Sequence, residues 1–297
     1  MISNQAAHNN ESYRLFGKRP LIGIVPCCPS VLTTVPALIR YFALVFTITW
    51  GVAGICLYTP AVVHLFRRWP ASTNPLFYLA VYAPSVAATV LTAKYDGLPG
   101  LRVLFGRLLP SRLALRWCLI VLVAFPVVGL LAGRAAWLLG GPDVCIPHWP
   151  HFYGALVPAL VIDPGPFGEE LGWRGFALPR LLQRWSPLTA SVVLGVIWGL
   201  WHLPAFFIVG LPQRRLTVPA MLLATVSVSV IDTWVFLRSR GNLLPPILVH
   251  LMTNHCFKLL GVSFGVSVVA GASGAFLILL GEWTLERGVA HAQRKQP

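Results

Sequence analysis

The chain has 297 residues, of which 56% are hydrophobic and only 11% are charged, and its mean hydropathy is +0.72. Soluble domains carry about 25% charged residues, so this composition excludes an ordinary soluble protein. The net charge of +14 would suggest a nucleic-acid partner in a soluble protein, but the basic residues here fall mostly between apolar runs. We therefore interpret them as a membrane-topology signal and expect no nucleic-acid partner.

Eight apolar segments have about the length that a helix needs to cross a bilayer, roughly 20 residues. Their hydrophobicity is continuous and does not alternate, and a backbone in lipid must be hydrogen-bonded internally, so helices are favoured over a barrel. The sequence predicts an all-α polytopic membrane helix bundle with about eight transmembrane helices. The predicted spans are residues 38–60, 76–93, 117–139, 152–170, 188–209, 217–237, 243–261 and 263–283.

The segments outside the spans are short. Residues 1–35 contain Pro26 and Pro29 and no signal-peptide cleavage site, so we predict an irregular or interfacial N-terminal tail. Residues 36–284 form one transmembrane domain, and residues 285–297 form a basic cytoplasmic C-terminal tail.

The distribution of lysine and arginine predicts the orientation. With the N-terminus inside, the inner segments hold 17 of the 23 basic residues. This excess places both termini in the cytoplasm, and the even number of spans agrees. The six remaining basic residues are Arg67, Arg68, Arg134, Arg214, Arg215 and Lys258.

Two adjacent acids stand at the end of the fourth predicted span, where ionisable groups are costly and therefore functional candidates. Arg174 follows Glu170 by four residues, so the two can pair on one helix face. Glu169 is rotated from Glu170 by about 100°, which leaves it free for chemistry. The alternative is a salt bridge that closes a helix end.

Three further polar residues lie in apolar spans. His202 lies in the fifth span, with Trp198 one helical turn earlier beside it, and a structural histidine among aromatic residues is the alternative. His250 and Asn254 share one face of the seventh span, and their N–H groups can donate to an oxyanion. The alternative for this pair is an interhelical hydrogen bond.

Other polar residues rank lower. His255 is off the face of the seventh span that carries His250, and Asp232 stands alone in the sixth span. Asp163, before a Pro-Gly-Pro sequence, is interpreted as a turn or helix-end residue, and Arg134 as a residue near a span end.

Glu169, His202, His250 and Asn254 fall on three spans that are otherwise almost entirely apolar. Such residues face the interior of a bundle, so we predict one intramembrane cavity, open to the cytoplasmic side. A carboxylate that can take a proton from water, imidazoles and amide donors are the groups that peptide-bond hydrolysis requires.

The motif Glu169-Glu170-x-x-x-Arg174 is followed by Trp198-x-x-x-His202 and His250-x-x-x-Asn254. Over about residues 150–260, this order resembles the CPBP family of intramembrane proteases. The family comprises the type II CAAX prenyl endopeptidases and the bacteriocin-processing or abortive-infection proteins. The sequences that flank the three motifs resemble its bacterial branch. Its second motif commonly begins with Phe, where this chain has Trp.

The resemblance implies a role for each motif residue. Glu169 would be the general base that activates water, assisted by His202. His250 and Asn254 would stabilise the oxyanion. Glu170 and Arg174 would form the supporting pair, with Trp198 as an aromatic wall.

The family is often labelled a metalloprotease, and Glu169, His202 and His250 could bind Zn²⁺ together with a water. The sequence lacks an HExxH motif, so metal-free glutamate catalysis is an equal interpretation.

The preferred hypothesis is an intramembrane endopeptidase in a bacterial cytoplasmic membrane, acting on a membrane-associated protein or peptide within the lipid bilayer. This endopeptidase would carry out either CAAX-type processing or the processing of bacteriocins and peptides. A non-proteolytic membrane regulator or immunity scaffold is the first alternative. A proton-coupled transporter is less favoured, because the sequence shows neither internal repeats nor paired broken helices.

Overall fold

The computed structural model describes residues 31–59, 62, 74–141 and 147–294, and it describes no side chains for residues 31–34 and 283–294. Most of the predicted tail, residues 1–35, therefore lies outside the described residues, but its last part is helical because α2 (Val31–Tyr58) begins at Val31. Throughout the described part of the chain, every regular element is helical, as predicted.

The remaining elements follow in chain order. They are α4 (Pro75–Gly106), α5 (Arg112–Leu138), α6 (Trp149–Ile162), α7 (Pro164–Gly172), the π-helical turn η3 (Trp173–Ala177), α8 (Leu178–Leu181), α9 (Pro187–Trp201), the short 3₁₀ turns η4 (Leu203–Phe206) and η5 (Pro212–Arg215), α10 (Val218–Arg238), α11 (Leu244–Leu259) and α12 (Phe264–Arg294).

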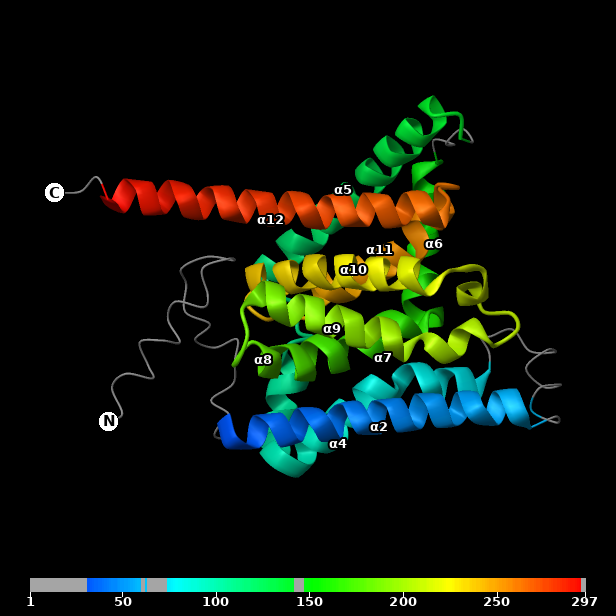
Figure 1. Cartoon of the computed structure of the whole chain (residues 1–297), viewed down its shortest axis with the longest axis vertical. Coiled ribbons are helices and arrows are strands. Elements are labelled where there is room, and N and C mark those ends of the chain that lie inside the picture. Colours follow the sequence, from blue (N-terminus) through cyan, green and yellow to red (C-terminus); the bar gives the residue numbers. More distant parts are fainter. Residues whose placement is uncertain (1–30, 60–61, 63–73, 142–146, 295–297) are drawn as a thin grey trace.

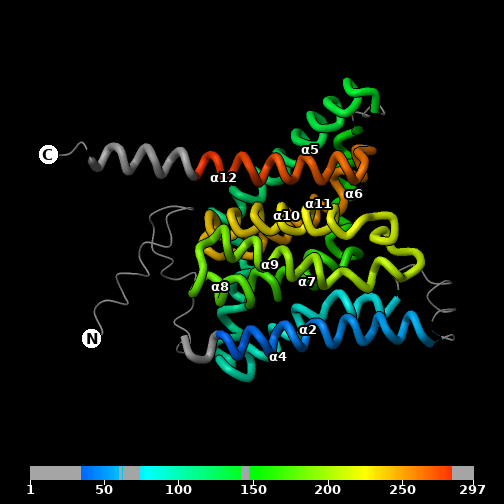
Figure 2. The backbone as a smooth tube through the Cα atoms, in the orientation of Figure 1, coloured from blue at the N-terminus to red at the C-terminus, as the bar shows by residue number. Residues whose placement is uncertain are grey.

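The long helices run back and forth between two ends of a bundle (Figures 1 and 2). We name as end A the end at which α2 begins and α4, α8, α10 and α12 finish. End B is the opposite end, where α2, α9 and α11 finish and where the segment between α9 and α10 lies (Figure 1). The first residue of α2 and the last residue of α12 are both at end A, as an even number of crossings requires.

Five helices, α2, α4, α5, α10 and α12, are long and apolar enough to cross a membrane. The corresponding predicted spans are confirmed as helices. The second is longer than predicted, because α4 continues past residue 93 to Gly106 through a kink at Gly97, whose φ is 62°. The predicted spans 188–209 and 243–261 correspond to the shorter helices α9 and α11.

The prediction of one unbroken span over residues 152–170 is wrong. Pro164 occupies the first turn of a new helix, and the Asp163 carboxylate caps that helix by accepting a hydrogen bond from the Gly165 N–H. As a result α6 lies across end B, while α7, η3 and α8 form one helical run over residues 164–181 toward end A (Figure 1). Glu169 and Glu170 therefore lie in the first half of this run, not at the end of a span.

The fifth span is also shorter than predicted. Helix α9 ends at Trp201, and His202 is its C-terminal cap instead of an interior residue. Pro204 explains the ending, because a proline cannot donate to a continuing helix and restricts the residue before it.

The run over residues 164–181 lies at the centre of the bundle. Its residues Trp173, Phe176 and Leu178 are fully buried. Gly172 lets α4 approach closely, since a Cβ there would stand 2.5 Å from the carbonyl carbon of Pro84. This central position brings residues of the run against α4, α9, α10 and α11 and places the candidate site among them.

Candidate active site

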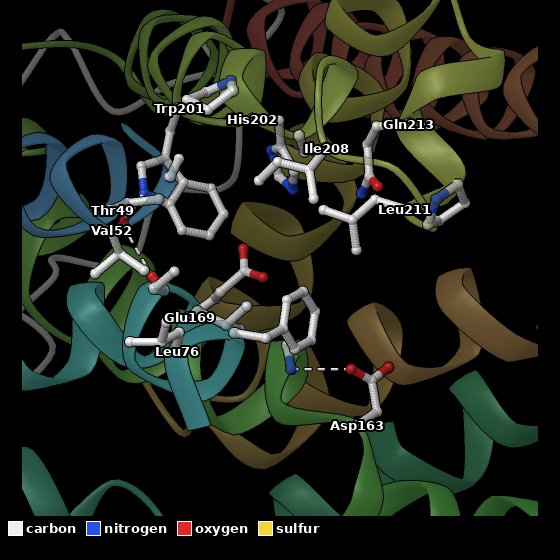
Figure 3. Close-up of a pocket in the computed structure, with 18 of the residues that line it drawn as sticks. Thr49, Val52, Leu76, Asp163, Glu169, Trp201, His202, Ile208, Leu211 and Gln213 are labelled. Atoms are coloured by element: carbon white, nitrogen blue, oxygen red, sulfur yellow. Dashed lines mark hydrogen bonds between the residues drawn. The ribbon is translucent and has the colours of Figure 1, made fainter. Parts of the chain in front are cut away.

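A cavity of about 340 Å³ penetrates the bundle, and Glu169, His202, His250 and Asn254 all line it. The Glu169 carboxylate and the His202 ring face its interior (Figure 3). The structure therefore brings together four residues from α7, α11 and the end of α9 that the sequence predicted to share a cavity.

Two tryptophans hold one oxygen of Glu169. Its Oε2 accepts a hydrogen bond from Trp198 Nε1 at 2.6 Å and one from Trp173 Nε1 at 3.4 Å. Within the described part of the chain no hydrogen bond occupies Oε1. One carboxylate oxygen is thus fixed, and the other is available to a molecule in the cavity.

A buried ion cluster lies directly behind the cavity wall. The predicted pair is present, with Arg174 Nη1 at 2.8 Å from Glu170 Oε1. Asp232, which ranked low in the sequence analysis, joins this pair, because its Oδ2 lies 3.0 Å from Arg174 Nη2. All three side chains are fully buried, so one guanidinium faces two carboxylates away from water.

His250 joins this cluster to the cavity. Its Nδ1 lies 2.8 Å from Glu170 Oε1. An ionised carboxylate accepts only, so Nδ1 carries the hydrogen and the ring is fixed with Nε2 on the opposite edge. The ring also packs edge-on against Trp198, at 5.2 Å between centroids.

His202 is fixed in a similar way by its own helix. Its Nδ1 lies 2.9 Å from the Trp198 carbonyl oxygen, which can only accept, so Nδ1 donates. A neutral His202 ring therefore presents a lone pair on Nε2. The predicted neighbour Trp198 lies beside it, with ring centroids 5.9 Å apart, and Trp201 is closer at 4.7 Å.

Asp163 and His255 belong to the site, although sequence reasoning ranked both low. Asp163 Oδ2 accepts from Asn254 Nδ2 at 2.9 Å and lies 3.0 Å from His255 Nε2. All three residues line the cavity. The interpretation of Asp163 as a turn or helix-end residue is confirmed, since it is the N-cap of α7, but nothing local indicated partners more than 90 residues away.

Because Gly165 has no side chain, it leaves a space between the polar groups of His250, Asn254 and Asp163. A Cβ on this residue would stand 3.2 Å from His250 Nε2 and 3.3 Å from Asn254 Nδ2. It would also lie 3.1 Å from Asp163 Oδ1. The two nitrogens therefore point toward one small volume that exists because the residue is glycine.

The candidate zinc ligands do not form a metal site in this geometry. Among the residues whose side chains are described, no group of three or more His, Cys, Asp or Glu is arranged to hold a metal ion. Glu169, His202 and His250 line the same cavity without making such a group. We therefore assign no step to a metal, and zinc binding stays a prediction.

Comparisons with known proteins agree with the motifs. The sequence model of the family described as "Type II CAAX prenyl endopeptidase Rce1-like" matches residues 147–256. The chain is also 25% identical over 240 residues to "CAAX prenyl protease 2" of Methanococcus maripaludis, covering 77% of this chain and 87% of that protein. The predicted family resemblance is confirmed, and every residue of the site described above lies within the matched segment.

Proposed function

We propose that this integral membrane protein, which resembles the type II CAAX prenyl endopeptidases, is an intramembrane endopeptidase that hydrolyses a peptide bond of a membrane-associated protein or peptide. The observation that carries the proposal is the cavity in which Glu169 Oε1 is available beside His202, His250 and Asn254. The family match and the name of the relative support peptidase activity. The lipid bilayer surrounds the site.

In the first step, a water in the cavity attacks the carbonyl carbon of the scissile bond. Glu169 Oε1 accepts a proton from this water, while the indole N–H groups hold Oε2 in place. The lone pair on His202 Nε2 accepts a hydrogen bond from the same water and orients it. A C–O bond forms, and the carbonyl electron pair moves to the oxygen, which becomes an oxyanion.

His250 Nε2 and Asn254 Nδ2 stabilise that oxyanion from the space beside Gly165. One hydrogen of the Asn254 amide is bound to Asp163, and the second is available for the oxyanion. His250 donates from Nε2 when its ring carries both hydrogens. An imidazolium at this position adds a second positive charge, beside that of Arg174, to the buried cluster with the carboxylates of Glu170 and Asp232.

In the second step, the tetrahedral intermediate collapses. Glu169 returns its proton to the nitrogen of the leaving amine, the C–N bond breaks, and the carbonyl re-forms as a carboxylic acid. Asp163 does not contact the reacting atoms. It acts as a positioning residue, because its carboxylate fixes the Asn254 amide and caps α7 at the same time.

An assay of the purified full-length protein in detergent with internally quenched peptides tests the proposal. The parent should cleave, and Glu169→Gln should be folded but inactive, because an amide of the same shape cannot accept a proton. Glu282→Gln, the same change at a residue that bonds Trp234 and Arg238 away from the cavity, should cleave like the parent.

Three outcomes would contradict the proposal. Equal cleavage by the parent and Glu169→Gln would remove the general base. No cleavage by the folded parent, together with substrate uptake into proteoliposomes, would favour the transporter instead. If cleavage and uptake are both absent, the regulator or scaffold remains as the explanation.

A further inference from the structure

The segment between α9 and α10 forms one wall of the active-site cavity. Pro204, Ile208, Leu211 and Gln213 of this segment all line the cavity. Figure 3 shows Ile208, Leu211 and Gln213 around the same space that the Glu169 carboxylate faces. Gln213 is the polar member of this otherwise apolar group, and the mechanism described above gives it no role.

The backbone around Gln213 is held by hydrogen bonds within the segment. The Arg214 N–H donates to the Leu211 carbonyl oxygen at 3.3 Å. The Leu216 N–H donates to the Gln213 carbonyl oxygen at 2.9 Å. Pro212, the first residue of η5, has its φ restricted by its ring. The Gln213 side chain therefore extends into the cavity wall from a hydrogen-bonded turn.

The Gln213 amide carries a hydrogen-bonding group that has no partner. Its Oε1 is shielded from solvent, and within the described part of the chain no group donates a hydrogen bond to it. Buried polar atoms in proteins almost always have a partner. An unpaired carbonyl oxygen on the wall of a cavity therefore indicates a donor that a bound molecule supplies.

The remaining polar side chains of the cavity narrow the chemistry of that molecule. Thr49 already donates to the Ala80 carbonyl oxygen and accepts from Trp201 Nε1. Among the described residues that line the cavity there is no lysine or arginine. A group that meets Gln213 therefore meets a neutral amide, which suits an uncharged N–H better than a carboxylate or a phosphate.

We propose that Gln213 is a substrate-binding residue that holds the backbone of a peptide against the α9–α10 wall. Its Oε1 accepts a hydrogen bond from a backbone N–H of the substrate, and its Nε2 donates to a backbone carbonyl oxygen. A side-chain amide thus matches the alternating donors and acceptors of an extended peptide. The consequence for cleavage, namely that this contact sets the position of the scissile bond relative to Glu169, rests on the proposed endopeptidase function.

Steady-state cleavage of an internally quenched peptide tests this role. Gln213→Met keeps the length of the side chain and removes both hydrogen-bonding groups. KM should rise by about 5–10-fold, the size of losing one neutral hydrogen bond, and kcat should stay nearly unchanged, because the contact is equally present before and during the reaction. Gln183→Met makes the same change at a partly buried glutamine outside the cavity lining and should keep the KM of the parent. Thermal unfolding checks each variant, and Gln213→Ala replaces Gln213→Met if the latter does not fold.

Modified peptides identify the backbone group that Gln213 binds. In a series of the same peptide, each backbone N–H except that of the scissile bond is replaced in turn by an ester oxygen. At one position the ester should raise the KM of the parent and leave the KM of Gln213→Met unchanged, since that partner is already missing. Equal effects on both proteins at every position would overturn the proposal.

Binding to a protein that cannot cleave separates this inference from the proposed function. A fluorescent form of the peptide is titrated into Glu169→Gln and into the double variant with Gln213→Met, and Kd should rise by a similar factor in the second. Normal cleavage by the parent with KM and Kd unaffected by Gln213→Met would overturn the binding role, leave the endopeptidase intact and assign Oε1 to water alone. A lower kcat at unchanged KM would also overturn it. Peptide binding that depends on Gln213, without cleavage by any folded protein, would instead remove the endopeptidase and retain the binding role.

Discussion

Glu170 Oε1 lies 2.8 Å from His250 Nδ1 and thereby joins α7 to a helix that begins more than 70 residues later. The same oxygen also accepts from Arg174, so a single carboxylate fixes both the arginine and the imidazole. The acid that sequence reasoning assigned only to a supporting pair therefore also sets the orientation of a proposed oxyanion donor.

Replacing Arg174 by Ala should strongly destabilise the protein. The change leaves Glu170 and Asp232 buried without their guanidinium, and loss of one partner of a buried ion pair costs about 3–5 kcal/mol. The measurement is thermal unfolding in detergent. Arg184→Ala, at an exposed position after the same helical run, is the control and should unfold like the parent. Equal stability of both variants would mean that Arg174 does not contribute to the stability of the fold.

The local part of this cluster was predictable and the rest was not. The Glu170–Arg174 pair follows from the spacing of four residues along one helix, and so does the shared face of His250 and Asn254. The contacts of Asp232 with Arg174 and of Glu170 with His250 depend on how helices pack. No local spacing specifies such packing, since each contact joins separate helices.

The same limit applies to the fold. Hydropathy located the helical segments, because apolar length is what a bilayer selects. It missed the break at Asp163, since a hydropathy window averages over Pro164 and Pro166 without registering that a proline starts a new helix. This single error placed Glu169 and Glu170 at the end of a span, whereas they lie in the first half of the helical run over residues 164–181.

Activity should fall as the pH is lowered. A protonated Glu169 cannot accept the proton of the attacking water, so turnover is present while the carboxylate is ionised and is lost as it protonates. The measurement is kcat for peptide cleavage across pH, with unfolding followed at each pH. A profile that stays flat to acid while the protein remains folded would exclude Glu169 as the base.

Chelation tests the zinc prediction independently. If the glutamate mechanism operates without metal, removal of metal should leave cleavage unchanged, and the purified active protein should contain no stoichiometric zinc. Loss of activity with a chelator, restored by added Zn²⁺, would instead require Glu169, His202 and His250 to rearrange into a metal site. Elemental analysis of the same sample distinguishes a resident ion from inhibition by the chelator itself.

Asn254→Ala should lower kcat by on the order of 10²–10³ and leave KM nearly unchanged, because the donor acts mainly on the developing oxyanion. Asp163→Asn should lower kcat in the same direction, because it disturbs the amide that Asp163 orients.

The double variant tests whether the two residues act together. In a protein that already carries Asn254→Ala, adding Asp163→Asn should lower kcat only slightly further. The reason is that the effects of mutations within one hydrogen-bond network are not additive. His255→Ala, which removes the other side-chain partner of Asp163 and keeps Asn254, is the control. Fully additive losses would mean that Asp163 acts through something other than Asn254.

Gly165→Ala should abolish most activity without unfolding the protein. Its methyl group would enter the space between His250 Nε2 and Asn254 Nδ2, at 3.2 and 3.3 Å from them. Neither side chain can move aside freely, because Glu170 holds one and Asp163 holds the other. We expect kcat to fall by at least about 10²-fold, the size of losing an oxyanion donor. Gly154→Ala, at an exposed position of α6 where a Cβ meets nothing within 4 Å, is the matched control and should be as active as the parent. A Gly165→Ala protein that is folded and fully active would show that the oxyanion does not occupy this space.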